Sequence, residues 1–290
     1  MSLTYDLHSH SLVSDGTVSP ADLVARARTA GVDVLALTDH DDTAGLAEAA
    51  AEAGRVGLRL VAGVEVSVTW ERMTVHVVGL HIDPEAPELS AGLARLRAFR
   101  HQRAVEMGRR LARHGIAGAF EGARALARGE SVSRTHFARF LVENGHVKDA
   151  RQAFRQYLRS GRPGHVSGQW AGLAEAVGWI RSAGGVAVLA HPARYGLTAT
   201  RLRRLCGQFA ECGGAGMEVV SGSHSLDDCL TMARYARDFE LAASVGSDYH
   251  GPENPWVELG RLSPLPEGCR PIWETWSLDP AYPQHDCVTV

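Results

Sequence analysis

Two histidines and an aspartate lie close together in the stretch YDLHSHSLVSDG at residues 5–16. His8 and His10 are separated by one residue, so on a strand both side chains point to the same side, because the side-chain period of a strand is two. Asp15 follows in the loop expected after that strand. Imidazoles and carboxylates, without thiolates, are ligands that Mn²⁺, Zn²⁺ and Fe²⁺ accept. The chain therefore opens with a candidate metal-binding segment.

Further candidate ligands lie within or at the ends of later apolar runs. These runs are VDVLALTDH (32–40), LRLVAGVEVSV (58–68), MTVHVVGLHI (73–82), GVAVLAH (185–191), GMEVVSG (216–222) and LAASVGSDYH (241–250). Such runs are typical of buried parallel strands. Together they contribute His40, Glu65, His76, His191, Asp248 and His250. In a β/α barrel the carboxyl ends of the strands converge on one face, where active sites are built. We therefore expect all nine side chains in one cleft.

Glu65 adds weight to this interpretation because it lies inside an apolar run. A buried carboxylate is costly unless it is paired or bound to metal. Nine ligands also exceed the need of one ion, so we expect two to three divalent ions with a bridging carboxylate. Clusters of this kind activate a water molecule and clamp the attacking and leaving oxygens of a phosphoryl displacement.

Helical patterns separate most of the predicted strands. SPADLVARARTAG has Ser19 as N-cap, Pro20 at the first helical position and Gly31 as a stop signal. Comparable patterns lie at 43–54, 173–185, 200–214 and 225–239. Strands that alternate with helices predict an α/β fold.

The alternation stops between about residues 85 and 170, where the patterns at 93–115, 133–145 and 149–161 are all helical. We interpret this region as an all-helical insert in a β/α body. The predicted division is a first barrel part (1–95), a helical substrate cap (96–168), and a second barrel part with a C-terminal tail (169–290). The tail after about residue 260 holds five of the twelve prolines and is predicted to be irregular surface covering.

Composition excludes several classes of protein. The chain is 45% hydrophobic and 22% charged, as in soluble globular proteins, and no apolar run reaches membrane-spanning length. The N-terminus lacks the basic and apolar regions of a secretory signal. The five cysteines are scattered and form no C-x-x-C pair, so neither a disulfide framework nor a thiolate zinc site is expected. We predict a cytoplasmic protein with no membrane association and no obligate protein partner.

Charge is distributed unevenly. Residues 95–159 hold 15 Lys and Arg against 5 Asp and Glu, a local charge of +10, which leaves −13 for the rest of a chain whose net charge is −3. A basic segment beside an acidic body indicates an anionic partner near that segment, although solvated helix faces give the same pattern.

The motifs DLHSHSLVSDG, ALTDHD, GVEVS, VHVVGLHI, LAHP and GSDYHG resemble, in order, those of the PHP (polymerase and histidinol phosphatase) family of amidohydrolase-type metal hydrolases. The resemblance implies a distorted seven-stranded TIM-like (β/α) barrel with a trinuclear metal centre, with Mn²⁺ as the expected ion and Zn²⁺ or Fe²⁺ as alternatives. Carried over by position, His8, His10, Glu65 and Asp248 hold one metal, and Asp15, His40 and His250 a second. Glu65, as a bridge, holds the third with His76 and His191.

The insert resembles the subgroup that hydrolyses nucleoside 3′,5′-bisphosphates, some bacterial members of which act as 5′→3′ exoribonucleases. The resemblance implies that the insert holds the 5′-phosphate. Ser133 caps a predicted helix whose first turn contains Arg134 and His136, which is a suitable phosphate site. Arg103, Lys148 and Arg194 are further candidate substrate contacts.

The expected reaction is hydrolysis of the 3′-phosphate to give a nucleoside 5′-phosphate and orthophosphate. The attacking group is a metal-bridging hydroxide held through Glu65, Asp15, His40 and Asp248. An exoribonuclease or oligonucleotidase acting on short 5′-phosphorylated RNA or DNA is the alternative. A histidinol phosphate phosphatase is less favoured because of the insert. A non-catalytic accessory module is disfavoured because the ligand set is complete.

Overall fold

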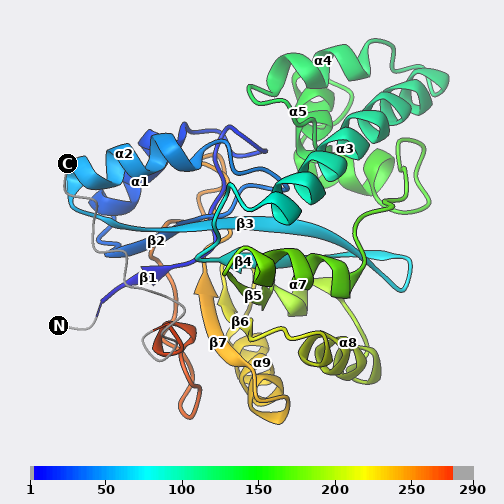
Figure 1. The fold of residues 1–290 in the computed structure, drawn as a ribbon. Coiled ribbons are helices and arrows are strands. Elements are labelled where there is room, and N and C mark those ends of the chain that lie inside the picture. Colours follow the sequence, from blue (N-terminus) through cyan, green and yellow to red (C-terminus); the bar gives the residue numbers. More distant parts are fainter. Residues whose placement is uncertain (1–2, 277–290) are drawn as a thin grey trace.

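Seven strands form one sheet whose spatial order follows the chain. They are β1 (Tyr5–Asp6), β2 (Val34–Leu37), β3 (Arg59–Trp70), β4 (Met73–Leu80), β5 (Val186–Leu189), β6 (Gly216–Ser221) and β7 (Ala242–Gly246). The computed structural model describes residues 3–276. The two outer strands of the sheet, β1 and β7, lie next to each other. There the amide of Leu7 donates to the carbonyl of Val245 at 3.0 Å, and the amide of Asp248 donates to the carbonyl of His8 at 2.9 Å. The sheet thus nearly closes into a barrel, which confirms the predicted fold class (Figure 1).

One strand runs against the prediction of parallel strands. β4 is antiparallel to both β3 and β5, whereas the other neighbouring pairs are parallel. The cause is a two-residue hairpin at Glu71 and Arg72, whose φ angles of 45° and 67° are left-handed. Such tight hairpins favour left-handed residues and are usually marked by Asn-Gly, a signal that this sequence lacks. The reversal brings His76, near the start of β4, to the edge at which its neighbours carry their ligands.

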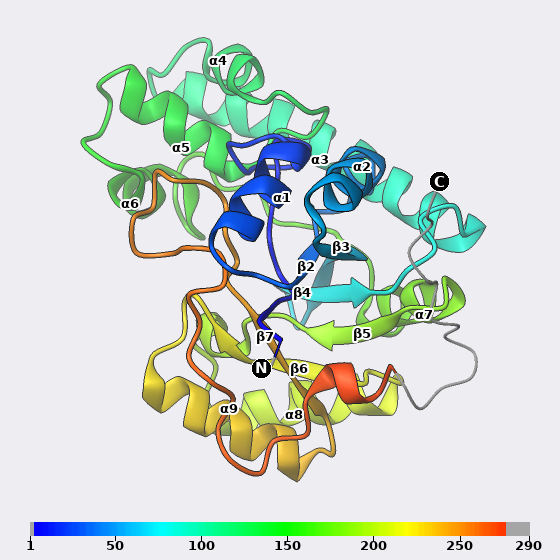
Figure 2. The same ribbon diagram turned by 90° about the vertical axis from the view of Figure 1, so that its left-hand side faces the viewer.

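Five helices cover the outside of the barrel (Figures 1 and 2). They are α1 (Pro20–Thr29), α2 (Leu46–Val56), α7 (Leu173–Ser182), α8 (Ala199–Glu211) and α9 (Leu226–Asp238). α1 begins as predicted, with the Ser19 side chain accepting a hydrogen bond from the amide of Asp22 and Pro20 in the first turn. α9 is capped in the same way by Ser225. The caps satisfy amides that a helix start leaves without partners.

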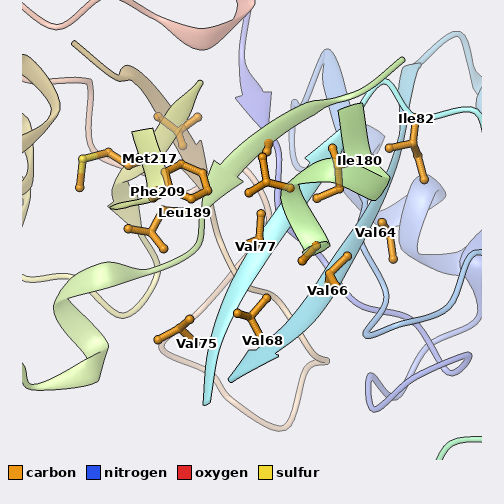
Figure 3. Packing of buried hydrophobic residues seen from close by; sticks show 14 of the residues in the cluster. Val64, Val66, Val68, Val75, Val77, Ile82, Ile180, Leu189, Phe209 and Met217 are labelled. Carbon is orange, nitrogen blue, oxygen red and sulfur yellow. The ribbon is translucent and has the colours of Figure 1, made fainter. Parts of the chain in front are cut away.

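The alternation of side chains along β3 divides the core into two layers. Val64, Val66 and Val68 face outward and belong to the cluster between the sheet and its covering helices, which also holds Ile180 of α7 (Figure 3). Val61 belongs to a second cluster inside the barrel, with side chains from the other strands. Glu65 lies between two outward-facing valines, so the two-residue period points it inward.

The insert consists of α3 (Pro87–Arg113), α4 (Ala119–Leu126), α5 (Arg134–Glu143), α6 (Ala150–Ala153) and a π-helical turn (Phe154–Leu158). α3 is continuous across the predicted boundary at 95/96. Its first half contributes Leu89, Leu93 and Leu96 to the barrel cluster. Its second half contributes Met107 and Leu111 to a separate cluster within the insert. The domain boundaries remain predictions, and α3 physically connects the two bodies.

The described part of the tail is irregular apart from one short turn, as predicted, but it also contributes to the core. Ile272, in the 3₁₀ turn Ile272–Glu274, is fully buried in the barrel-interior cluster. Trp273 stacks on Tyr5 with ring centroids 4.0 Å apart. Residues 261–276 therefore close the end of the barrel opposite the edge that carries the candidate ligands. Residues 277–290 lie outside the described part of the chain.

Candidate active site

All nine predicted ligands lie together at the carboxyl edge of the parallel strands. They form four overlapping groups in which the nitrogen and oxygen atoms lie within 4.8 Å of one another. The groups are His10, Asp15, His40 and His250; His8, Glu65 and His191; His8, His10 and Asp248; and His40, Glu65 and His76. The fold thus brings together residues from the two ends of the chain. That these residues hold metals remains a prediction.

Glu65 is the centre of the cluster. It is fully buried, and histidines approach both of its oxygens. His76 Nδ1 and His191 Nε2 lie 2.8 Å and 3.0 Å from Oε1. His40 Nδ1 lies 2.6 Å from Oε2. His8 and His10 follow at 3.4 Å and 3.5 Å. A carboxylate so surrounded has the position required of a bridging ligand.

Two of the ligands and one of their neighbours have backbone conformations that side chains rarely adopt. The φ angles of Asp41, His191 and Asp248 are 54°, 28° and 56°. Left-handed φ values cost about 1–3 kcal/mol at non-glycine residues, and they cluster at functional sites. The fold therefore holds strained turns where the ligands are presented.

Several buried nitrogen and oxygen atoms of the candidate ligands have no hydrogen-bond partner among the described residues, as expected where a metal ion would bind. The atoms are His10 Nδ1, Asp15 Oδ1, His40 Nδ1, Glu65 Oε2, His76 Nδ1 and His191 Nδ1. Several are close to an oppositely charged group but are not aligned for a hydrogen bond, as at the 2.6 Å contact of His40 with Glu65. Buried polar atoms rarely remain unsatisfied. The unpaired nitrogen and oxygen atoms of the cluster fit divalent cations that prefer imidazole and carboxylate.

The electrostatics give most of the ligands the protonation state that metal binding requires. Burial alone would raise the pKa of Asp15, Glu65 and Asp248, but the surrounding histidines hold each pKa well below its ordinary value. Burial lowers the pKa of His10 to about 3 and of His76 to about 4. Ionised carboxylates and neutral imidazoles are the forms that bind metals.

His8 and His250 differ from His10 and His76 in the direction of their pKa shifts. Burial would lower the pKa of His8, but Glu218, Glu65 and Asp248 raise it well above its ordinary value. Against the same effect of burial, Asp15 and Asp248 raise the pKa of His250 to about 9. Metal binding at these two side chains is therefore expected to release protons.

Glu218 of β6 is a functional residue that the sequence analysis missed. Its side chain is 1% exposed, and its two oxygens have separate partners. Oε1 lies 2.6 Å from His8 Nδ1, and Oε2 accepts a hydrogen bond of 2.6 Å from the backbone amide of His191. Glutamate inside the apolar run GMEVVSG is the same signal that identified Glu65 in GVEVS. Glu218 orients one ligand and fixes the strained turn that presents another.

Asp39 and Asp41 were also missed, although they flank His40 in TDHDD. Asp39 accepts hydrogen bonds from the amide and hydroxyl of Ser11 at 2.8 Å and 2.6 Å, which ties the loop before Asp15 to the end of β2. Asp41 accepts from Arg100 Nε of α3 at 2.6 Å and from the amide of Ser67 at 2.7 Å. These carboxylates hold the loops that carry the ligands.

A cavity of about 250 Å³ leads from the cluster to the insert. Its barrel side is lined by Asp15, His40, His76, His191, Asp248 and His250, with Ser67, Thr74, Arg194 and Tyr195. Its insert side is lined by Arg100, Arg103, Ser133, Arg134, Thr135 and Phe154, with Trp170 beside them. One end of the cavity is thus rich in candidate metal ligands and the other in arginine.

The predicted substrate contacts divide into two sets. Ser133, Arg134, Arg103 and Arg194 line the cavity. His136 and Lys148 do not line it. His136 is 2% exposed, and its Nδ1 accepts a hydrogen bond of 3.1 Å from the amide of Ser133. In this structure His136 therefore completes the capping box of α5.

The arginines on the insert side are crowded. Burial and the proximity of Arg134 and Arg100 lower the pKa of Arg103 to about 9. Burial, Arg100 and Arg194 lower the pKa of Arg134. Arg100 is paired with Asp41, whereas neither Arg103 nor Arg134 has a carboxylate within 4.0 Å among the described residues. A buried arginine (Arg103) and a half-buried one (Arg134), both without a carboxylate partner in the described part of the chain, favour an anionic ligand.

Arg194 lies on the barrel side of the cavity, where its Nη1 donates to Asp248 Oδ2 at 2.6 Å. The side chain is 56% exposed, so it can also reach a bound molecule.

No helix in the described part of the chain is long and apolar enough to cross a membrane.

Comparison with known proteins identifies the family. The PHP domain model matches residues 6–166. A 3′,5′-nucleoside bisphosphate phosphatase of Chromobacterium violaceum is 54% identical over 269 residues, which cover 92% of this chain and 94% of the relative. The 5′-3′ exoribonuclease Rnm of Escherichia coli is 46% identical over 274 residues, covering 94% and 93%.

Solved structures agree with this assignment. An amidohydrolase of Chromobacterium violaceum with bound sulfate has a TM-score of 0.90 at 53% identity, covering 94% of this chain and 95% of that one. A structure from Bifidobacterium adolescentis has a TM-score of 0.80 at 27% identity and covers 96% of each chain. The chain belongs to the PHP-domain family of metal-dependent hydrolases.

Proposed function

We propose that the protein is a metal-dependent phosphatase that removes the 3′-phosphate from nucleoside 3′,5′-bisphosphates such as adenosine 3′,5′-bisphosphate. The observation that carries the proposal is the cavity with a candidate metal-ligand cluster at one end and, at the other, two arginines, Arg103 and Arg134, without a carboxylate partner among the described residues. A substrate with two phosphates on one nucleoside matches a site with two anion-binding ends. The 54% identity to a relative named for this activity supports the same substrate class.

The proposed cofactors are two to three divalent ions, with Mn²⁺ favoured over Zn²⁺ and Fe²⁺. His8, His10, Glu65 and Asp248 are proposed to hold one ion, Asp15, His40 and His250 a second, and Glu65, His76 and His191 a third. The grouping of His8, His10 and Asp248, and that of Asp15, His40 and His250 with His10, support the first two sets. The contacts of His76 and His191 with the same oxygen of Glu65, Oε1, support the third. Bound ions would supply activation of a water molecule and neutralisation of charge on a phosphoryl group. Glu65, Asp15, His40 and Asp248 are the side chains that would position the attacking group.

The side chains of the cavity bind and orient the substrate. Arg134 and Arg103 are proposed to receive the 5′-phosphate, with the Ser133 hydroxyl beside them at the start of α5. Arg194, which donates to Asp248, is proposed to contact the 3′-phosphate from the barrel side. Binding at the insert end restricts the position of the 3′-phosphate at the cluster, and interactions remote from the reacting atoms contribute to kcat by such orientation.

A 5′→3′ exoribonuclease is the second candidate function. It is favoured by relatives of 45–46% identity that carry this name. The same geometry serves both reactions, because cleavage at the first 3′ linkage of a 5′-phosphorylated RNA breaks the same bond between O3′ and phosphorus. The two functions differ in the leaving group, which is an oligonucleotide in place of orthophosphate.

The decisive experiment compares substrates on the Mn²⁺-loaded protein. The value of kcat/KM would be measured with adenosine 3′,5′-bisphosphate and with a short 5′-phosphorylated RNA. A much higher value for the bisphosphate supports the proposed function. An equal or higher value for RNA would replace it with the exoribonuclease, and activity on neither would reject both.

Arg134→Ala tests the 5′-phosphate site. Hydrogen bonds to charged groups contribute about 1.5–3 kcal/mol, so kcat/KM on the bisphosphate should fall roughly 10- to 150-fold. Activity on an aryl phosphate without a second phosphate should change little. Arg113→Ala, at an exposed position of α3, is the matched control and should leave both rates unchanged. Equal losses on both substrates for Arg134→Ala would refute a role in binding the 5′-phosphate.

A further inference from the structure

The helical insert touches the metal-ligand cluster directly, through the second residue of α5. The Thr135 hydroxyl donates a hydrogen bond of 3.0 Å to Asp15 Oδ2. One turn later, Arg139 Nη2 donates to the backbone carbonyl of Asp15, also at 3.0 Å. In Figure 2 α5 lies beside the loop that precedes α1, which is the loop that carries Asp15. The insert therefore holds both the side chain and the backbone of one candidate ligand.

The two carboxylate oxygens of Asp15 have different surroundings. Oδ2 is occupied by Thr135. Oδ1 is buried and has no hydrogen-bond partner. It faces His250 Nε2 at 3.3 Å and His40 Nε2 at 3.8 Å, within the group that also includes His10. The hydroxyl of Thr135 thus selects which oxygen of Asp15 remains free for a cation.

Thr135 is also adjacent to the proposed anion site. Arg134 precedes it in the chain, and both side chains line the same cavity. Ser133 caps the helix start by accepting a hydrogen bond of 3.0 Å from the Thr135 amide. An anion held by Arg134 would therefore act on the same helical turn that positions Asp15. This turn belongs to the insert, whereas the ligands it faces belong to the barrel.

We propose that Thr135 is a positioning residue through which an anion bound at the first turn of α5 strengthens metal binding at Asp15, His40 and His250. The identity of the anion as a nucleotide 5′-phosphate rests on the proposed function, but the contact of Thr135 with Asp15 does not. Coupling of this kind is reciprocal, so the metal strengthens binding of the anion by the same factor. The insert then has two roles, since it binds the substrate and also helps to retain the metal.

The test measures metal affinity instead of catalysis. Dissociation constants for Mn²⁺ would be determined by competition with a fluorescent chelator, for the wild type, Thr135→Val and Thr135→Ser. Valine keeps the shape of threonine and removes the donor, whereas serine keeps the donor. Substitutions that disturb the partners of a metal ligand typically cost 10- to 100-fold in affinity, so Thr135→Val should bind Mn²⁺ about 10-fold more weakly and Thr135→Ser should retain most of the affinity.

The same titrations would be repeated with saturating adenosine 5′-monophosphate, the expected product. In the wild type the nucleotide should tighten Mn²⁺ binding by at least about fivefold, within the usual range of coupling between sites. In Thr135→Val this effect should be largely lost. Thr29→Val is the matched control, because its hydroxyl donates to Ala25 on the exposed side of α1. It should bind Mn²⁺ and respond to the nucleotide like the wild type.

Each outcome decides a separate point. Wild-type Mn²⁺ affinity in folded Thr135→Val would overturn the positioning role, whatever the substrate is. A nucleotide effect that persists in Thr135→Val would show direct contact between nucleotide and metal and would overturn coupling through Thr135. If adenosine 5′-monophosphate does not bind at all, the proposed nucleotide function and the coupling fail together, while the nucleotide-free comparison of variants still decides the role of Thr135.

Discussion

Replacing Glu218 by Gln should weaken metal binding, although Glu218 is not among the candidate ligands. Its two carboxylate oxygens face two donors, His8 Nδ1 and the backbone amide of His191, each at 2.6 Å. A glutamine has one acceptor and one donor group at these positions. Either the amide of His191 loses its acceptor, or an NH₂ group faces His8 Nδ1. In the second case the neutral form of His8, which is the form that binds metal, carries its proton on Nε2, the atom that faces Glu65 and Asp248.

The magnitude follows from burial. A buried donor without a partner costs about 1–3 kcal/mol. Loss of a group that orients a ligand typically reduces metal affinity by 10- to 100-fold, which is about 1.4–2.8 kcal/mol. The two ranges of free energy overlap. We therefore expect Glu218→Gln to bind Mn²⁺ roughly 10- to 100-fold more weakly than the wild type.

The assay is chelator competition on purified protein, with the melting temperature of the metal-free variant as a check on folding. Glu175→Gln is the matched control because Glu175 forms an exposed pair with Arg95, far weaker than a buried one. It should leave Mn²⁺ affinity unchanged. A folded Glu218→Gln protein with wild-type affinity would refute the reasoning that Glu218 sets the orientation of His8 and His191.

Two further predictions concern stability. A Cβ atom at Gly92 of α3 would lie 2.6 Å from the ring of Trp179 in α7. Gly92→Ala should therefore lower the free energy of unfolding in urea by about 1–3 kcal/mol. At Gly54 in α2 nothing in the described part of the chain lies within 4 Å of such an atom, so Gly54→Ala should raise the free energy of unfolding by about 0.5–1 kcal/mol. Equal effects would refute the close α3–α7 packing. Burial lowers the pKa of His136 from 6.5 to about 4, so its contribution to stability is complete above pH 6.5 and is lost as the pH falls to 4. The difference in unfolding free energy between the metal-free wild type and His136→Asn should therefore decrease by up to about 3 kcal/mol as the pH falls from 6.5 to 4. A difference that does not change with pH would contradict a neutral His136 that accepts a hydrogen bond from the Ser133 amide.

The sequence alone determined the fold class and the composition of the site. The ligands at the ends of apolar runs, from His8 to His250, could be found because a strand period of two and the convergence of strand ends are local rules with a global consequence. Glu65 was visible because charge in an apolar strand demands a partner. The same rule would have found Glu218, had it been applied to every strand.

Only the tertiary structure decided the features that depend on neighbours distant in the chain. The direction of β4 depends on a hairpin whose residues, Glu71 and Arg72, carry no turn signature. His136 has the type and position of a substrate contact, yet its nitrogen is used by the helix cap. The contact of Thr135 with Asp15 joins residues 120 positions apart. Local patterns indicate which side chains could bind a metal or a substrate, whereas long-range packing determines the partner that each side chain contacts.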